Sequence, residues 1–317
     1  MNRCPNCAAE LIPGAKFCHR CGDKVVEKTK DCPACHHANP LASVFCHHCG
    51  FHFEGKQRPK HTYIPQYILD FDPETITEQV KALFFRSLRG RVEEEHDPTR
   101  YSDYVERFYQ SRFREIYEVR AKQIAAEVLT QWERFGTEAL PEIDKRIDEA
   151  FEGLLDYFTI QFCPDLNGVL LPETILRYEK VTPGQTDLWR MIQDFLDFDR
   201  EEEVFYFNFI TMPEEYVANA CKHFLTAQRK EKVFFICDLS LKGNCKEGFA
   251  LTDRGIYWRA PFDKARSVAY YELAEIEKGK DWLTINGHFF TANPSLNLKL
   301  FKLLKKLRGW RAVAVPA

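Results

Sequence analysis

The stretch CPNCAAELIPGAKFCHRCG, residues 4–22, returns 28 residues later as CPACHHANPLASVFCHHCG, residues 32–50. Each copy contains a CxxC pair, ten further residues and a second CxxC pair, and the offset is the same at every cysteine. A repeat of this length predicts two copies of one small folded unit. The repeated cysteines are Cys4, Cys7, Cys18, Cys21, Cys32, Cys35, Cys46 and Cys49.

The cysteine spacing predicts one metal site in each copy. A CxxC turn directs two sulfurs at one ion, and a second such turn completes a tetrahedron with Zn–S distances of about 2.3 Å. Iron or a redox-active dithiol is the alternative, but a thioredoxin-like couple needs one reactive thiol, whereas these pairs come in fours. We therefore predict two structural Zn²⁺ ions, with four cysteine ligands each.

These motifs resemble the double zinc ribbon family, whose units have the form CPxCG followed by FCxxCG. The resemblance covers residues 4–50 and implies that all eight repeated cysteines bind metal. Ala8 and His36 stand where the family pattern has glycine after the first cysteine pair. The resemblance implies a metal-bound head at residues 1–53 and implies no particular function.

Histidines are frequent in the same segment and offer an alternative set of ligands. Structural zinc is complete with four ligands, and each copy already supplies four thiolates. We therefore predict that the imidazoles are exposed and do not contact the metal. These residues are His19, His36, His37, His47 and His48.

The chain has 317 residues, of which 45% are apolar, so that it can form about two domains besides the small metal-bound units. It contains no run of eighteen apolar residues, and its start, MNRCPNCAAE, lacks the apolar stretch of a secretory signal. We expect a cytoplasmic protein without a transmembrane segment. Its twelve cysteines then serve as metal ligands and buried thiols rather than as disulfides.

A polar stretch with Gly55 and Pro59 predicts a linker over residues 54–66, followed by an all-α middle domain at 67–212. Apolar residues at helical spacing predict helices at about 73–89, from the Asp97-Pro98 start signal to about Gly136, and from Pro141 onward. An acidic run at residues 194–203 lacks the spacing of a calcium loop, so we interpret it as a solvated face.

From Lys232 the pattern changes to short apolar runs that predict strands, and Asn286-Gly287 between two such runs indicates a hairpin. After Pro294 a helix carries leucines on one face and cations on the other. About six antiparallel strands closed by one helix resemble the pleckstrin-homology-like barrel. The stretch GFALTDRGIYWR, residues 248–259, is similar to bacterial members of that superfamily.

This second resemblance covers residues 213–310 and implies a β-barrel domain with a C-terminal helix at residues 213–317. Barrels of this kind bind peptides, lipid headgroups or other proteins in different families, so that the fold does not determine the ligand. The sequence thus predicts a multidomain α+β protein, with tandem zinc ribbons, an all-α middle domain and a pleckstrin-homology-like β-barrel.

Charge is unevenly distributed along the chain. Net charge is +4 over residues 1–60, −14 over 61–229 and +7 over 230–317. The C-terminal helix could contact a membrane surface or nucleic acid through its cations. Its leucine face can be buried only once, however, so we interpret the cations as the solvated face of a helix that covers the barrel. These cations are Lys299, Lys302, Lys305, Lys306 and Arg308.

No phosphate-binding loop, nucleophile elbow or HExxH motif is present, so we predict neither catalytic nor cofactor-binding residues and expect no enzyme. The leading hypothesis is a zinc-binding adaptor that binds a protein partner through its ribbons and its barrel. The alternative is a regulatory protein that binds nucleic acid through the cations of its ribbons. Those cations are Arg3, Lys16, Arg20, Lys24, Lys28 and Lys30.

Overall fold

The chain forms two compact units, residues 1–64 and residues 65–317. The structure, a computed structural model, describes residues 4, 6–10, 18–22, 29–33, 35–41, 43, 46, 48, 53, 64–179 and 186–308. Of the predicted linker at 54–66, only residues 64–66 belong to the described part.

The first unit, here called the head, contains a short antiparallel hairpin. Strand β1 (Thr29–Asp31) pairs with β2 (Ala38–Pro40), with Lys30 opposite Asn39. The ammonium group of Lys30 lies 4.1 Å from the ring centroid of Phe53, a cation–π contact within the head. The hairpin loop contains Cys32 and Cys35, so the two strands fix the position of the first CxxC turn of the second copy.

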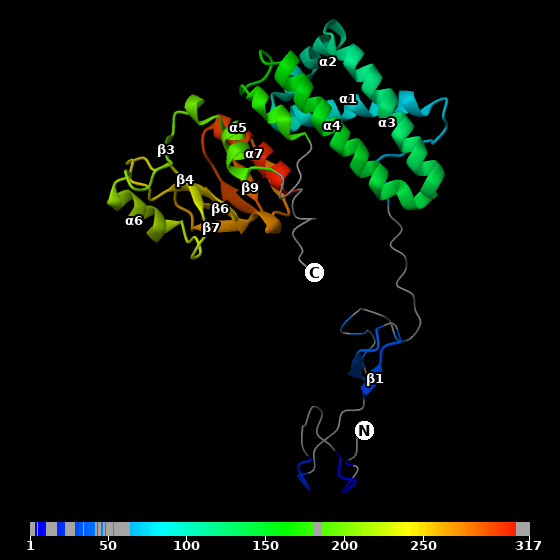
Figure 1. Cartoon of the computed structure of the whole chain (residues 1–317), viewed down its shortest axis with the longest axis vertical. Coiled ribbons are helices and arrows are strands. Elements are labelled where there is room, and N and C mark those ends of the chain that lie inside the picture. The colour runs from blue at the N-terminus through cyan, green and yellow to red at the C-terminus, as the bar shows by residue number, and fades with distance from the viewer. Residues whose placement is uncertain are drawn as a thin grey trace. The chain divides into compact units, whose positions relative to one another are not determined.

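The second unit begins with a bundle of four helices that surround an aromatic core (Figure 1). Phe84 is fully buried at its centre, and its ring lies 4.4 Å from the ring of Tyr117. No helix in the described ranges combines the length and the apolar composition that crossing a membrane requires. The bundle helices are α1 (Ile76–Glu95), α2 (Tyr101–Gln110), α3 (Phe113–Phe135) and α4 (Leu140–Phe162).

The Asp97-Pro98 start signal is confirmed, but the long helix predicted after it is wrong. Asp97 accepts a hydrogen bond from the Thr99 backbone N–H and starts a 3₁₀ turn (Pro98–Arg100) before α2. The chain then breaks at residues 111–112. Phe113 lies five positions after Phe108, a spacing that would place the two rings on different faces of one continuous helix. The break allows both rings to enter the core, with centroids 5.8 Å apart.

The described residues of 164–212 are not all helical, as an all-α domain would require. They contain the 3₁₀ turn η3 (Glu173–Tyr178), helix α5 (Leu188–Leu196), the 3₁₀ turn η4 (Phe198–Arg200) and strand β3 (Val204–Tyr206). The all-α prediction is wrong at β3, which pairs with a strand of the following sheet, and α5 packs into the core of that sheet. The domain boundary at residue 212 stays a prediction.

All six predicted strand segments contain strands, but the predicted closed barrel is replaced by two antiparallel sheets. The larger sheet has the order β3-β4-β5-β6-β7 and the smaller β10-β9-β8. A 3₁₀ turn (Tyr270–Glu272) separates β7 from β8, and these two strands do not pair in residues 186–308. The strands are β4 (Val233–Asp238), β5 (Gly248–Thr252), β6 (Gly255–Arg259), β7 (Arg266–Ala269), β8 (Ile276–Lys278), β9 (Leu283–Ile285) and β10 (His288–Phe290).

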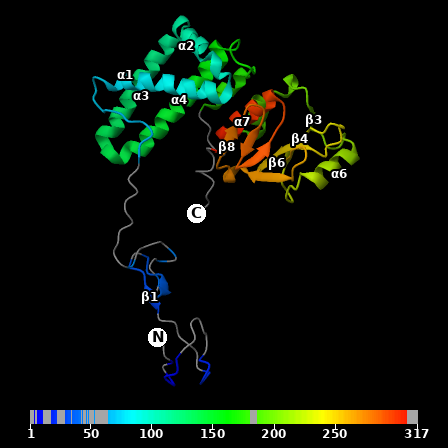
Figure 2. The same cartoon turned by 180° about the vertical axis from the view of Figure 1, so that it is seen from behind.

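Strands β4 and β5 of the larger sheet are buried on both faces, which explains why their sequences are almost continuously apolar. Phe235 and Cys237 belong to one apolar core, and Ile236 belongs to another on the opposite face, because side chains alternate along a strand. Helix α6 (Glu214–His223) covers the Ile236 face, and helix α7 (Pro294–Arg308) belongs to the other core (Figure 2). We call residues 186–308, which hold both sheets, the sheet region.

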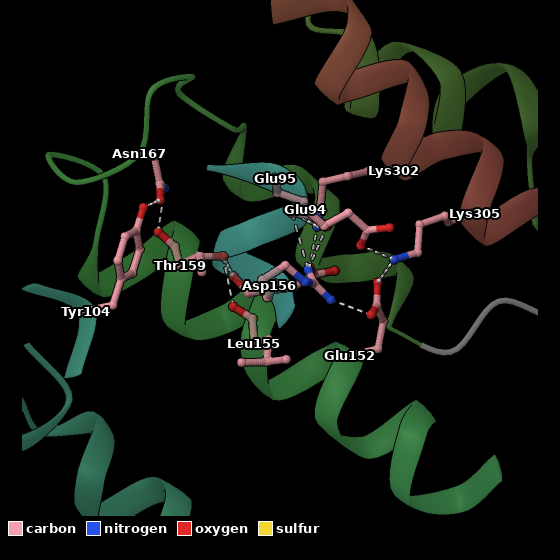
Figure 3. Close-up of polar contacts among 11 residues, drawn as sticks. Glu94, Glu95, Tyr104, Glu152, Leu155, Asp156, Thr159, Asn167, Lys302 and Lys305 are labelled. Atoms are coloured by element: carbon pink, nitrogen blue, oxygen red, sulfur yellow. Dashed lines mark hydrogen bonds and ion pairs between the residues drawn. The ribbon is translucent and has the colours of Figure 1, made fainter. Parts of the chain in front are cut away.

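Helix α7 buries its leucine face as predicted, but its cations do not form a solvated face. Lys299 and Lys302 are only 1% and 3% exposed. Lys302 forms ion pairs with Glu95 of α1 and Asp156 of α4 (Figure 3), whereas Lys299 pairs with Glu201. The prediction was wrong because it considered the helix against one neighbour, and α7 lies between two.

Burial and pairing change the pKa values of groups at the end of α1. Burial alone would raise the pKa of Glu95, but Arg91 and Lys302 outweigh it and lower the pKa to about 2. Burial lowers the pKa of His96 to about 4. Within the described part of the chain, neither ring nitrogen of His96 has a hydrogen-bond partner, and the ring stacks on Tyr104.

These shifts predict that the second unit loses stability in acid in two stages. The unfolded chain takes up a proton at His96 near pH 6.5 and the folded chain only near pH 4, so stability falls between these values, by on the order of 3 kcal/mol. Glu95 adds a further loss from about pH 4.5 towards pH 2. Urea unfolding at a series of pH values measures both stages.

The variant His96→Phe keeps a ring against Tyr104 and removes the titrating group. It should flatten the stability curve between pH 6.5 and 4 and leave the loss at lower pH unchanged. An unchanged slope between pH 6.5 and 4 would show that His96 does not carry the first stage.

Candidate metal centre

The first copy of the repeat gathers its four cysteine sulfurs into one cluster. All four sulfur atoms of Cys4, Cys7, Cys18 and Cys21 lie within 4.8 Å of one another. The Cys4–Cys21 and Cys7–Cys18 sulfur pairs are each separated by 3.6 Å. Four sulfurs placed tetrahedrally at 2.3 Å from a zinc ion are about 3.8 Å apart, so this cluster fits a zinc ion.

The first CxxC turn has the same backbone geometry in both copies. The Ala8 N–H donates to the Cys4 carbonyl at 2.9 Å, and the His36 N–H donates to the Cys32 carbonyl at 2.8 Å. Both turns require a positive φ at the residue after the second cysteine, 56° at Ala8 and 58° at His36. Glycine adopts this conformation without strain, which explains why it is typical of the family pattern at these two positions.

In the second CxxC turn of each copy, a backbone N–H group donates a hydrogen bond to a cysteine sulfur. Backbone N–H groups of Arg20 and His48 each lie 3.4 Å from the sulfur of the cysteine two residues earlier, Cys18 and Cys46. Backbone donors from Cys21 and Arg20 lower the pKa of Cys18 to about 6. The Cys18 thiolate, which is the form that binds metal, is therefore favoured near neutral pH even before a cation contributes.

In the second copy, Cys32, Cys35 and Cys46 form a matching cluster. The sulfurs of Cys35 and Cys46 are 3.6 Å apart, as in the first copy. Cys49, the predicted fourth ligand, lies outside the described residues. Three described thiolates and the same turn geometry fit a second zinc ion, for which the repeat assigns Cys49 as the remaining ligand.

Asn39 is a member of the second site that sequence reasoning missed. Its side chain is fully buried, and its amide N–H₂ donates to the Cys46 sulfur at 3.5 Å and to the His37 carbonyl at 2.6 Å. A donor to a metal-bound thiolate orients it and reduces its charge density. Comparison of the two copies does not identify Asn39, because the equivalent position in the first copy, 28 residues earlier, is Leu11.

The described histidines lie outside both cysteine clusters. His19, His36, His37 and His48 are exposed, as predicted, and His47 lies outside the described residues. The rings of His37 and His48 stack with centroids 5.1 Å apart, which aligns two imidazoles on the surface of the head.

Comparison with known proteins agrees with this geometry. Residues 4–50 match the family model of the double zinc ribbon. No curated protein matches the chain, and no solved structure matches it. The prediction of two structural zinc ions is confirmed by the family match together with the two cysteine clusters.

The geometry predicts about two zinc equivalents per purified chain, measured by elemental analysis. Cys18→Ser and Cys46→Ser should each remove about one equivalent, because the loss of one thiolate opens one closed site. Cys221→Ser, a change at an exposed thiol of the second unit, is the matched control and should keep both equivalents. Full zinc retention by Cys18→Ser would contradict the assignment.

The positive φ of Ala8 predicts a second result. Ala8→Gly relieves strain in the first turn, so zinc at that site should resist a competing chelator better, by roughly 0.5–1 kcal/mol. Ala9→Gly, one residue later and without a positive φ, is the control and should give no gain. Equal effects of the two substitutions would argue against strain at Ala8.

Proposed function

We propose that this protein is a non-catalytic adaptor whose zinc-stabilised head captures a protein partner. The eight cysteines of the repeat are the zinc ligands in this proposal, Cys49 included. The observation that carries it is the closed character of the first metal site, whose four thiolates are all described. Four thiolates leave no position for water or substrate, which is typical of structural rather than catalytic zinc.

Thiols of the second unit support a non-catalytic role. Burial raises the pKa of Cys163 and of Cys245 to about 12, and it also raises the pKa of Cys237. Nucleophilic cysteines need the opposite shift, because the thiolate is the reactive form. These three side chains are therefore neutral packing groups at physiological pH.

The head has an exposed apolar anchor. Leu41 follows β2 directly and is 54% exposed, and the stacked His37 and His48 lie on the same small unit. An exposed apolar side chain of this kind can enter the apolar centre of a protein interface. We assign Leu41 to the partner-binding surface.

For residues 213–310 we propose a pleckstrin-homology-like fold as the second recognition module. The order of elements supports it: an antiparallel meander β4-β5-β6-β7, a second meander β8-β9-β10, and α7 after the last strand. The described part ends at Arg308.

Binding of nucleic acid through the head is the alternative. Of the six cations on which it rests, Arg20 and Lys30 are described; the other four lie outside the described residues. Arg20 is exposed, but Lys30 already contacts the ring of Phe53. Phosphate contacts make affinity fall steeply with salt, so a retardation assay at two salt concentrations detects this mode.

Affinity capture from native cells, with the full zinc-loaded chain as bait, tests the proposal. The double variant Cys18→Ser/Cys46→Ser should lose at least about tenfold of the captured protein, because the head no longer has a fixed shape. Thermal unfolding of the second unit should be unchanged in this variant.

A matched pair of leucines locates the binding surface. Leu41→Ala on the head should reduce capture of the same protein, and Leu241→Ala, at a fully exposed leucine of the sheet region, should not. Capture that survives the double cysteine variant would contradict the adaptor proposal. A salt-sensitive retardation of nucleic acid, lost in the same variant, would favour the alternative.

A further inference from the structure

The contact between the bundle (α1–α4) and the sheet region centres on buried charges (Figure 3). Lys302 of α7 has a side chain only 3% exposed. Its Nζ lies 2.9 Å from a carboxylate oxygen of Glu95 and 2.6 Å from one of Asp156. Because Glu95 belongs to α1 and Asp156 to α4, one lysine bridges two helices of the bundle.

Arg91 of α1 balances these charges. Its side chain is 3% exposed, and its guanidinium pairs with Glu95 at 3.3 Å and with Asp156. Two buried cations thus face two buried carboxylates. Arg91 also pairs with the more exposed Glu152, and Lys305 lies 3.9 Å from Glu152 and extends the network to Glu94 at 3.2 Å.

Between helices α1–α4 and helix α7, apolar packing contributes little. The bundle core and the sheet core are separate sets of residues, and Ile160 is the only buried apolar residue of α1–α4, all of which are described, that belongs to the sheet core. The buried leucines of α7 all belong to the sheet core. Hence α7 is an integral part of the sheet region and meets the bundle mainly with its charged face.

A permanent interface gains little from such a network. Removing two ions from water is unfavourable, and well-packed apolar residues of similar volume often stabilise an interface as well or better. Charged side chains have one advantage, which is that water solvates them fully when the interface separates. Separated leucines would instead expose apolar surface.

We propose that this interface is a latch, at which the sheet region with α7 separates from the bundle as a unit and closes again. Opening exposes an acidic face on the bundle and a basic face on α7, and of the buried apolar residues of α1–α4 only Ile160 leaves the sheet core. The latch does not depend on the proposed function of the head. Its charged and titratable groups are Arg91, Glu94 and Glu95 of α1, His96 directly after α1, Glu152 and Asp156 of α4, Lys302, Lys305 and Lys306 of α7, and Lys278 of β8.

Lys299 provides an internal control on the same helix. It is as buried as Lys302, but its partner is Glu201, which also accepts hydrogen bonds from Asn293 and Ser295. All four residues belong to the sheet region. Opening of the latch therefore exposes Lys302 and leaves Lys299 buried, whereas unfolding of the sheet region exposes both.

Acetylation of lysines in the full zinc-loaded chain, followed by mass spectrometry of each residue, separates these cases. In native buffer Lys302 should react at least about tenfold faster than Lys299, because sub-global opening is more frequent than unfolding. Exposed Lys242 provides the upper reference rate. Equal slow rates at Lys302 and Lys299 would overturn the proposal.

Two matched variants sharpen the test. Glu95→Gln removes one charge that faces Lys302, and should raise the Lys302 rate by about tenfold or more with no change at Lys299. Glu201→Gln removes the partner of Lys299 and should leave the Lys302 rate unchanged. A parallel rise at both lysines in Glu95→Gln would indicate unfolding rather than a latch and would also overturn the proposal.

Discussion

Helix α7 packs against both the sheet core and the bundle, and the fold of the second unit depends on both contacts. Its leucines complete the core of the sheet region, and its lysines neutralise acidic groups on the bundle. Either neighbour alone would leave one face unmatched. Without Lys302, the carboxylates of Glu95 and Asp156 would remain buried with Arg91 as their main counter-charge, a costly arrangement in a low dielectric.

The head is stabilised by metal ions rather than by an apolar core. Fewer than sixty-five residues with few apolar side chains cannot bury enough surface to be stable, so that metal–thiolate bonds replace a core. The two copies repeat the same hydrogen bonds and the same strained φ at Ala8 and His36, which indicates that metal geometry dictates the backbone. The strain persists because the bonds between the metal and the cysteines hold each turn in this conformation.

The sequence predicted those features that depend on the spacing of residues close together in the chain. The cysteine repeat identified the metal sites, and the apolar runs after Lys232 identified six of the eight strands in the two larger sheets. It missed β3 and β8, which are three residues long and have no turn signal like the Asn286-Gly287 pair that marks the equally short β9 and β10. It also predicted one helix where the shift from Phe108 to Phe113 forces a break. The sequence did not predict the role of Asn39, because only folding brings its side chain close to the Cys46 sulfur.

The structure explains part of the uneven charge distribution along the sequence. A middle segment of net charge −14 precedes a C-terminal segment of +7, and the sequence predicted that the cations of the C-terminal helix face water. In the structure, Lys302 and Lys305 of the basic segment pair with acidic residues of the middle segment, so part of this asymmetry is complementarity within one chain. Helical periodicity cannot distinguish a cationic face in water from one against carboxylates, because both produce the same pattern. The distinction depends on acidic residues that lie about 150 to 210 positions earlier in the chain, and only the folded contact brings them within reach of α7.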